Sequence, residues 1–453
     1  MAPRKPLSFR QSLNSAMFRS SALRSLVASR PLAGYLRCKT SLNKSLRRQF
    51  SSVMDTTNFT ETQLDVREAI SKICSRFPDE YWAERDETQE YPGELHAALA
   101  KDGWIGICLA AENGGAGLGI SEATMMLHTI SESGAGMAGA QSLHANIYAT
   151  QPVSKFASNE QKAQWIPPLI SGQSRTCFGV TEPNTGLETL ALQTKAVRDG
   201  DHYSITGSKI WITNAQIADT MVLLARTSEP SALVKPSQCL SLFYIPFDKT
   251  QPGLDLRKIK KMGGRAVDAN EIFFDSYRIP ASSLIGKEGD GFKMVLHGMN
   301  AERCLLAGEA LGLGYAALNK ATKYAKERVV FGSPIGKNQS IQHALAECYM
   351  NLEAAKLATY HAAKLYDAVA AGESDMGNKA VGAAANSAKY LAAEAAYKAC
   401  ERAVLTLGGM GYAQEYHVER YLRECLVPRI APVSREMILN FVGEKVLGLP
   451  KSY

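Results

Sequence analysis

The stretch TCFGVTEPNTGLETLALQTKAVRDGDHYSITGSKIWITNA, residues 176–215, decides the fold of this chain. It has three parts. FGVTEPNTG, residues 178–186, is a short apolar run that ends in a loop of Pro, Asn, Thr and Gly. Residues 196–207, AVRDGDHYSITG, alternate polar and apolar side chains around an Asp-Gly pair, which predicts a β-hairpin. KIWITN, residues 209–214, is β-branched and aromatic and predicts a strand.

Two interpretations of this stretch are open on its residues alone. Strand ends and tight loops offer backbone N–H groups, hydroxyls and one large flat ring, Trp211, which together suit a planar polar cofactor. The alternative is an ordinary hairpin whose Trp packs in a core. Alternation does not distinguish the two, because both place every second side chain on one face.

The first 54 residues differ in composition from the rest. They contain eleven Lys or Arg, many Ser and no acid, which predicts a mitochondrial transit peptide with its processing region at residues 47–52. A basic arm that binds nucleic acid or a membrane is the alternative. The whole chain has 51 basic and 44 acidic residues, so residues 55–453 have 40 against 44. The mildly acidic remainder gives no reason to expect nucleic-acid binding.

Several kinds of site are not expected. No apolar run reaches the ~18 residues that span a bilayer, so we expect no integral membrane segment. The nine Cys are scattered without a CxxC pair, which predicts free thiols. The eight His are isolated, and no His, Cys or acidic cluster has the spacing of metal ligands, so we expect no metal site.

Apolar periodicity divides the remaining chain into three parts. Residues 58–171 have helical spacing and predict an N-terminal helical domain. Residues 172–283 carry short apolar runs at 221–225, 239–245 and 271–274 between turn residues, which predict a middle β domain. Residues 284–453 are helical again, with Ala-rich runs at 291–328, 340–372 and 376–408 that predict long packed helices. The predicted fold is therefore mainly α with a central β domain.

Four motifs resemble the acyl-CoA dehydrogenase family. VTEPNTG followed by GSKIWITNA resembles its two flavin-contacting segments. RVVFG at 328–332, with Gln339 after it, resembles the R-x-x-F-G motif, although a lone Arg at a helix end is otherwise a solvated cap. LGGMGY at 407–412 resembles the GGxGY turn. The resemblance covers residues 58–453 and implies an N-terminal helical domain, a middle β-barrel-like domain and a C-terminal four-helix bundle.

The same resemblance implies FAD as the cofactor and assigns its contacts. The flavin ring and its loop would involve Phe178, Val180, Thr181, Gly186, Trp211 and Thr213. The remainder of FAD would be held by Arg328, Phe331, Gln339, Leu405, Gly408 and Gly409, and Ser434 would also contact the cofactor. Arg328 and Gln339 would reach it across a subunit interface. Arg suits a pyrophosphate because its charged fork binds two oxygens at once. Leu187, Asn300 and Arg303 would bind the substrate.

The implied chemistry needs a base for a weakly acidic α proton, and desolvation makes a carboxylate basic enough. Many family members carry this Glu in a tail motif Y-E-G-T, which is Ala-Pro-Val-Ser at 431–434 here. A minority, including isovaleryl- and long-chain enzymes, carry it on a bundle helix in a motif like D-x-E-R, which resembles Asn300-Ala301-Glu302-Arg303. The resemblance therefore implies Glu302 as the base and Glu309 as the reserve. An exposed helical Glu-Arg pair is the alternative.

The sequence departs from the family at three positions. Pro432 lacks the backbone N–H that helps to hold the thioester oxygen, Leu187 replaces a common Ser, and Leu405 replaces a common Gln. The implied function is FAD-dependent dehydrogenation of an acyl-CoA to the trans-2-enoyl-CoA, by a homotetramer in the mitochondrial matrix that passes electrons to electron-transfer flavoprotein. A same-fold flavin oxidase or monooxygenase, or an inactive assembly or scaffold protein, is the alternative.

Overall fold

The computed structural model describes residues 53–452, so residues 1–52 of the predicted transit peptide lie outside it. Helices form the first part of the described chain. Their bounds are α2 Glu61–Cys74, α3 Asp79–Thr88, α4 Gly93–Lys101, α5 Ile120–Ile130, α6 Gly136–Tyr148, α7 Thr150–Phe156 and α8 Asn159–Ile170. A capping box of Thr60 and Gln63 starts α2, and each side chain bonds the other residue's backbone N–H.

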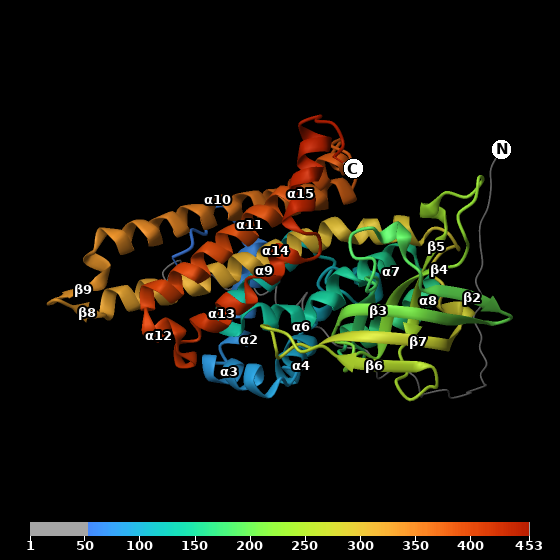
Figure 1. The fold of residues 1–453 in the computed structure, drawn as a ribbon, viewed down its shortest axis with the longest axis horizontal. Coiled ribbons are helices and arrows are strands. Elements are labelled where there is room, and N and C mark those ends of the chain that lie inside the picture. The colour runs from blue at the N-terminus through green and yellow to red at the C-terminus, as the bar shows by residue number, and fades with distance from the viewer. Residues whose placement is uncertain (1–52, 453) are drawn as a thin grey trace, which may run out of the picture.

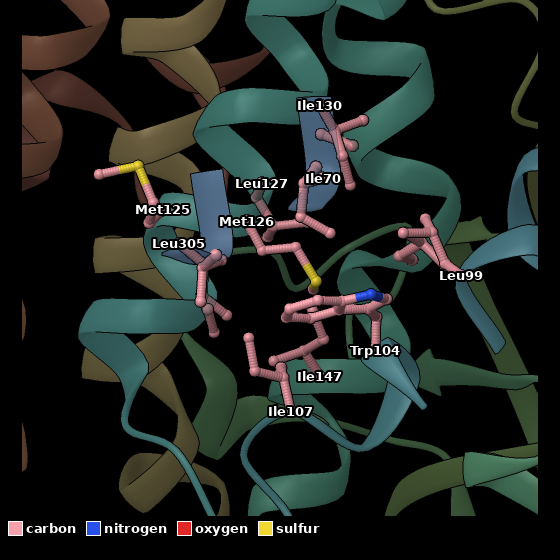
Figure 2. Close-up of a cluster of buried hydrophobic side chains, with 14 of the residues drawn as sticks. Ile70, Leu99, Trp104, Ile107, Met125, Met126, Leu127, Ile130, Ile147 and Leu305 are labelled. Atoms are coloured by element: carbon pink, nitrogen blue, oxygen red, sulfur yellow. The ribbon is translucent and has the colours of Figure 1, made fainter. Parts of the chain in front are cut away.

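The helical core of this part includes residues of distant helices, among them Leu305. Figure 2 shows Trp104 and Met126 side by side, with Ile147 and Ile107 next to them and Leu305 at the edge of the cluster. Leu305 lies in α9, Gly291–Glu327, which belongs to the C-terminal part of the chain. The first and last parts of the chain therefore share one apolar core.

A seven-stranded sheet follows the first helices. Its strands are β1 Thr176–Gly179, β2 Lys195–Asp199, β3 His202–Thr213, β4 Thr220–Arg226, β5 Leu240–Pro246, β6 Leu254–Lys258 and β7 Ala269–Pro280. The order is β1-β4-β2-β3-β7-β6, with β5 paired to β4. The predicted hairpin is confirmed, because β2 and β3 pair antiparallel with Asp199 opposite His202. The three predicted apolar runs lie in β4, β5 and β7.

Three long helices dominate the C-terminal part. They are α9, α10 Gln339–Ala370 and α11 Asn378–Leu407, and they correspond to the three predicted Ala-rich runs. The two-stranded hairpin β8 Val329–Val330 and β9 Ser333–Pro334 connects α9 to α10. Short helices follow: α12 Gly409–Tyr412, α13 Val418–Glu424, α14 Val427–Ile430 and α15 Arg435–Phe441. The fourth helix beside α9 and α10 is α5 of the N-terminal part, rather than a long C-terminal helix.

The two ends of the molecule carry different elements. The β sheet lies at one end, and the hairpin of β8 and β9 lies at the other, with the long helices between them (Figure 1). Among residues 53–452, no helix is long and apolar enough to cross a membrane. The eight Cys of this range are free, as predicted, and Cys38 lies outside it.

The first described residues pack against the long helices. The Val53 N–H donates to Asn319 Oδ1 at 3.1 Å, the Asp55 N–H donates to Glu353 Oε1 at 3.1 Å, and Met54 is buried. Val53 and Met54 are the last two residues of the predicted transit peptide, 1–54. Met54 is buried and Val53 is partly buried, so both residues belong to the folded body.

Candidate active site

The loop after β1 is fastened to β3 by one buried lysine. Lys209 has no exposed surface, and its Nζ donates to Val180 O at 2.9 Å and to Glu182 Oε1 at 2.8 Å. The Glu182 carboxylate also accepts the N–H groups of Gln193 and Thr194 at 2.7 and 2.9 Å. These bonds satisfy a charge that would be costly to bury alone. They hold the VTEPNTG loop in one position.

A bulge in β3 turns Trp211 outward. The pairing of β3 with β7 shifts between Lys209 and Ile212, and Trp211 has a φ of 62°. A bulge adds one residue to a strand and redirects its side chain. Trp211 is therefore 57% exposed, whereas its neighbour Ile212 is buried. The alternative interpretation, a Trp packed in a core, is wrong.

The other residues assigned to the flavin ring lie at the same end of β1 and β3. Thr181 O accepts the Ile210 N–H at 2.9 Å, which joins the loop to the strand that carries Trp211. Thr213 ends that strand and is partly exposed. The Phe178 ring meets the Tyr148 ring edge-on at 5.1 Å, and Val180 packs in the same apolar cluster. Beyond them in the loop lie Gly186 and Leu187, both exposed.

Glu302 lies on α9 among four charged or titratable groups. His144 of α6, Arg303 and Glu309 of α9 and Lys389 of α11 all act on its carboxylate. Burial raises the pKa of Glu302 to about 7, and the nearby cations offset part of that effect. Within residues 53–452 the carboxylate accepts no hydrogen bond, and its oxygens are not sealed off from solvent. A carboxylate with these properties is suited to take a proton near neutral pH.

Glu309, the reserve candidate for the base, is hydrogen-bonded to His144. Glu309 is fully buried, and its Oε1 accepts the Nδ1 proton of His144 at 2.5 Å. Glu309 therefore has a fixed partner, which Glu302 lacks in the described chain. Sequence reasoning treated His144 as an isolated histidine and missed this pair. Nothing local to either residue indicates it, because they are 165 positions apart.

Lys389 connects residues 431–434 of the C-terminal segment to the surroundings of Glu302. Its Nζ donates to Val433 O at 2.6 Å, and Lys389 itself faces Glu302 and Arg303. Residues 431–434, where many relatives carry the base, thus lie beside the helix that carries Glu302. The Ser434 hydroxyl accepts the Met437 N–H at 3.3 Å and caps α15.

The residues assigned to the substrate are divided between two places. Arg303 Nη1 donates to Asn300 Oδ1 at 2.8 Å, so these two side chains form a unit on α9 next to Glu302. Burial lowers the pKa of the Arg303 guanidinium, and its Nε is buried without a partner in the described chain. Leu187 lies instead on the loop after β1.

The residues assigned to the remainder of FAD form a second set, separate from the residues assigned to the flavin ring. This second set lies at the end of the long helices that is away from the β sheet. Arg328 ends α9, Phe331 is the fully exposed tip of the hairpin of β8 and β9, and Gln339 starts α10. Leu405 is exposed near the end of α11, followed by Gly408 and Gly409. Figure 1 places this end of the bundle opposite the β sheet. One copy of the chain therefore does not bring the two sets together.

These residues fit FAD at each end. Trp211 presents an exposed flat ring beside a loop whose backbone is held rigidly. No atom lies within 4 Å of a Cβ built on Gly186, Gly408 or Gly409, which leaves room for a cofactor to approach the backbone. Among residues 53–452, no group of three His, Cys, Asp or Glu has a metal-binding arrangement.

The fold and the site define a class of protein. It is an enzyme with a helical, a β and a second helical part, in which a carboxylate of raised pKa, Glu302, accompanies a surface suited to a flavin. Three family models match the chain, namely acyl-CoA dehydrogenase N-terminal domain over residues 60–173, middle domain over 177–277 and C-terminal domain over 289–447. The chain belongs to the acyl-CoA dehydrogenase family. FAD is the cofactor of this family and of this protein.

Relatives match nearly the whole folded body. The chain is 34% identical over 406 residues to acyl-CoA dehydrogenase FadE12 of Mycobacterium tuberculosis, covering 88% of this chain and 100% of that protein. It is 32% identical to the mitochondrial short-chain specific acyl-CoA dehydrogenase of Rattus norvegicus, covering 86% and 92%. The structure of butyryl-CoA dehydrogenase from Megasphaera elsdenii matches with a TM-score of 0.78 at 30% identity, covering 87% and 100%. The FAD complex of PigA matches with a TM-score of 0.79 at 27% identity, covering 87% and 100%.

Proposed function

We propose that this acyl-CoA dehydrogenase converts an acyl-CoA thioester to the trans-2-enoyl-CoA with Glu302 as its base. The observation that carries the proposal is the state of Glu302. Its carboxylate has a pKa raised to about 7 by burial, keeps oxygens within reach of solvent and has no fixed hydrogen-bond partner in the described chain. These are the properties that removal of a thioester α proton requires.

The residues around Glu302 each contribute to the reaction. FAD, when bound, would supply the acceptor for the hydride of the β carbon. Glu302 takes the α proton, and Arg303, held by Asn300, provides a cation for the CoA part of the substrate. Pro432 has no N–H to offer the thioester oxygen, so the proposed reaction requires other donors for that oxygen. A base on the bundle helix favours branched or long acyl groups by analogy with the enzymes that share it.

We propose further that the protein is a homotetramer. The first set of FAD residues lies at the sheet and the second at the opposite end of the long helices (Figure 1). The second end also exposes Val329, Phe331 and Tyr412, and exposed apolar groups of this kind mark surfaces that bind another protein. A second copy that places this end on the sheet of the first would complete each FAD site.

The location and the electron acceptor are also proposals. Residues 1–54 have the composition of a mitochondrial transit peptide, and one relative is named as a mitochondrial enzyme, which together support the matrix. Electron-transfer flavoprotein is the proposed acceptor. One structural neighbour with a TM-score of 0.79 comes from work on an electron-transferring flavoprotein of Acidaminococcus fermentans, which supports the association.

The test is an anaerobic titration of the purified, FAD-loaded protein with a panel of acyl-CoAs, followed by flavin absorbance. Bleaching by one class of acyl group supports the proposal and names the substrate class. Glu302→Gln should bind the same acyl-CoA and slow bleaching about 10²- to 10⁴-fold. Equal rates in the variant and the wild type would exclude Glu302 as the base. A yellow protein that no thioester bleaches, but that consumes oxygen with another substrate, would favour the oxidase or monooxygenase alternative.

A further inference from the structure

A buried ion pair lies between α6 and α9 beside the proposed base. His144 Nδ1 donates to Glu309 Oε1 at 2.5 Å. Glu309 has no exposed side-chain surface, whereas the His144 side chain keeps 11% exposed. An ion pair removed from water is costly to form unless its geometry is good. Because this ion pair lies beside the proposed base, we infer that it contributes to the reaction rather than to stability alone.

Helix geometry places this pair on the face that carries Glu302. Glu302 and Glu309 are seven residues apart on α9, which is close to two turns and puts them on one face. On α6, His144 and Tyr148 are one turn apart, and their rings lie 4.8 Å from each other. The two helices are close here, because a Cβ added to Gly298 would lie 3.2 Å from Tyr148 O. Gly298 is one turn before Glu302.

The charges around this face have opposite effects on Glu302. His144, Arg303 and Lys389 favour its ionised form, whereas burial and Glu309 favour its protonated form. His144 in turn faces Glu309 and Glu302, which together raise its pKa despite burial. Tyr148 also faces Glu302 and Glu309, and burial keeps its phenol neutral by raising its pKa. His144 thus interacts with both carboxylates, by a hydrogen bond to Glu309 and through its charge with Glu302.

We propose that His144 and Glu309 form a positioning pair for the base: Glu309 orients the imidazole through Nδ1 and keeps it protonated, and the resulting cation keeps Glu302 ionised. The proposal rests on the proposed role of Glu302 and deepens it. Glu309 is not a second base in this scheme. It holds a positive charge on the neighbouring helix that a neutral imidazole would not supply. Removing His144 takes this cation away, whereas removing Glu309 also takes away a carboxylate that favours the protonated form of Glu302, so His144→Gln has the larger expected effect on Glu302.

The main experiment compares pH profiles of kcat/KM for flavin reduction by the best acyl-CoA. In His144→Gln the acid limb should move to higher pH by about one unit, because loss of a nearby positive charge raises a carboxyl pKa. In Glu309→Gln the shift should be smaller, because Glu309 itself favours the protonated form of Glu302. His128→Gln is the matched control. His128 is also buried and lies 3.6 Å from a carboxylate, Glu132, but neither residue is among the groups that act on Glu302.

The outcomes separate the two proposals. If the wild type reduces its flavin and the acid limb of His144→Gln stays where it was, the positioning role is excluded and the base assignment survives. A uniform loss of rate at every pH would likewise indicate packing alone. If no acyl-CoA reduces the wild-type flavin, the proposed function itself fails. A shift of equal size in the His128 control would show that the effect is not specific to this pair.

A second measurement does not depend on turnover. The ¹⁵N imidazole spectrum of the FAD-loaded wild type, without acyl-CoA, reports the protonation of each His. The His144 signals, identified by their absence in His144→Gln, should be those of an imidazolium at pH 7, whereas His128, whose pKa burial lowers to about 3, should be neutral. A neutral His144 at pH 7 would overturn the proposal.

Discussion

Lys209→Met should destabilise the fold by removing a buried cation. Lys209 is fully buried, and its ammonium group meets Glu182 Oε1 at 2.8 Å and Val180 O at 2.9 Å. Methionine keeps most of the apolar length of the side chain but removes the charge. Glu182 would then be a buried carboxylate without a cation, which the folded state must either desolvate alone or protonate.

The magnitude follows from the contacts that remain. Breaking a buried ion pair by removing one partner costs about 3–5 kcal/mol. Glu182 would keep the N–H groups of Gln193 and Thr194, so we expect the lower end, about 3 kcal/mol, in the free energy of unfolding. Because Lys209 fastens the VTEPNTG loop to β3, we also expect weaker retention of FAD.

The same hairpin supplies a control. Lys195 of β2 forms a 2.9 Å ion pair with Glu229, but 57% and 65% of these two side chains are exposed. Exposed pairs contribute about 0–1 kcal/mol, so Lys195→Met should leave stability and FAD binding nearly unchanged. Urea unfolding followed by circular dichroism, with FAD release followed by fluorescence, measures both effects. The reasoning is refuted if the two variants lose the same stability, or if Lys209→Met loses less than about 1 kcal/mol.

Three further predictions concern Glu302, the hairpin of β8 and β9, and the N-terminal residues 53–56. With a pKa of about 7 for Glu302, kcat/KM should fall about tenfold from pH 8 to pH 6, since the base acts when ionised; a flat profile contradicts this assignment. Phe331→Asp should yield smaller oligomers in light scattering and lose FAD, whereas Leu233→Asp, on another exposed surface, should do neither. A chain that starts after residue 56 should unfold about 2 kcal/mol more easily than one that starts at Val53, because Met54 leaves the core; equal stability would show that these residues do not support the fold.

Local pattern was sufficient for most of the fold. The runs at 291–328, 340–372 and 376–408 became α9, α10 and α11 within a few residues, because an apolar face repeated over eight or more turns has few other ways to be buried. The Asp-Gly hairpin formed where the turn residues predicted it. The fourth helix of the bundle was not predictable in this way, since α5 is contributed by a segment far away in the chain.

The candidate site was predictable only in part. Glu302 could be named because the tail motif has Pro432 where many relatives have Glu. Trp211 could be a core residue or a cofactor contact until the bulge in β3 showed that its ring faces outward, since a single extra residue in a strand changes which side chains are buried.

The sequence by itself determined the three parts of the chain, the loop that resembles a flavin contact and the identity of the proposed base, because each depends on residues close together in the chain. Only the tertiary structure decided that Glu309 pairs with His144, that Lys389 joins the tail to the helix of Glu302, and that the two FAD sets lie at opposite ends of one copy. These relations join residues of different helices and strands. They follow from how the elements pack, and no local periodicity records them.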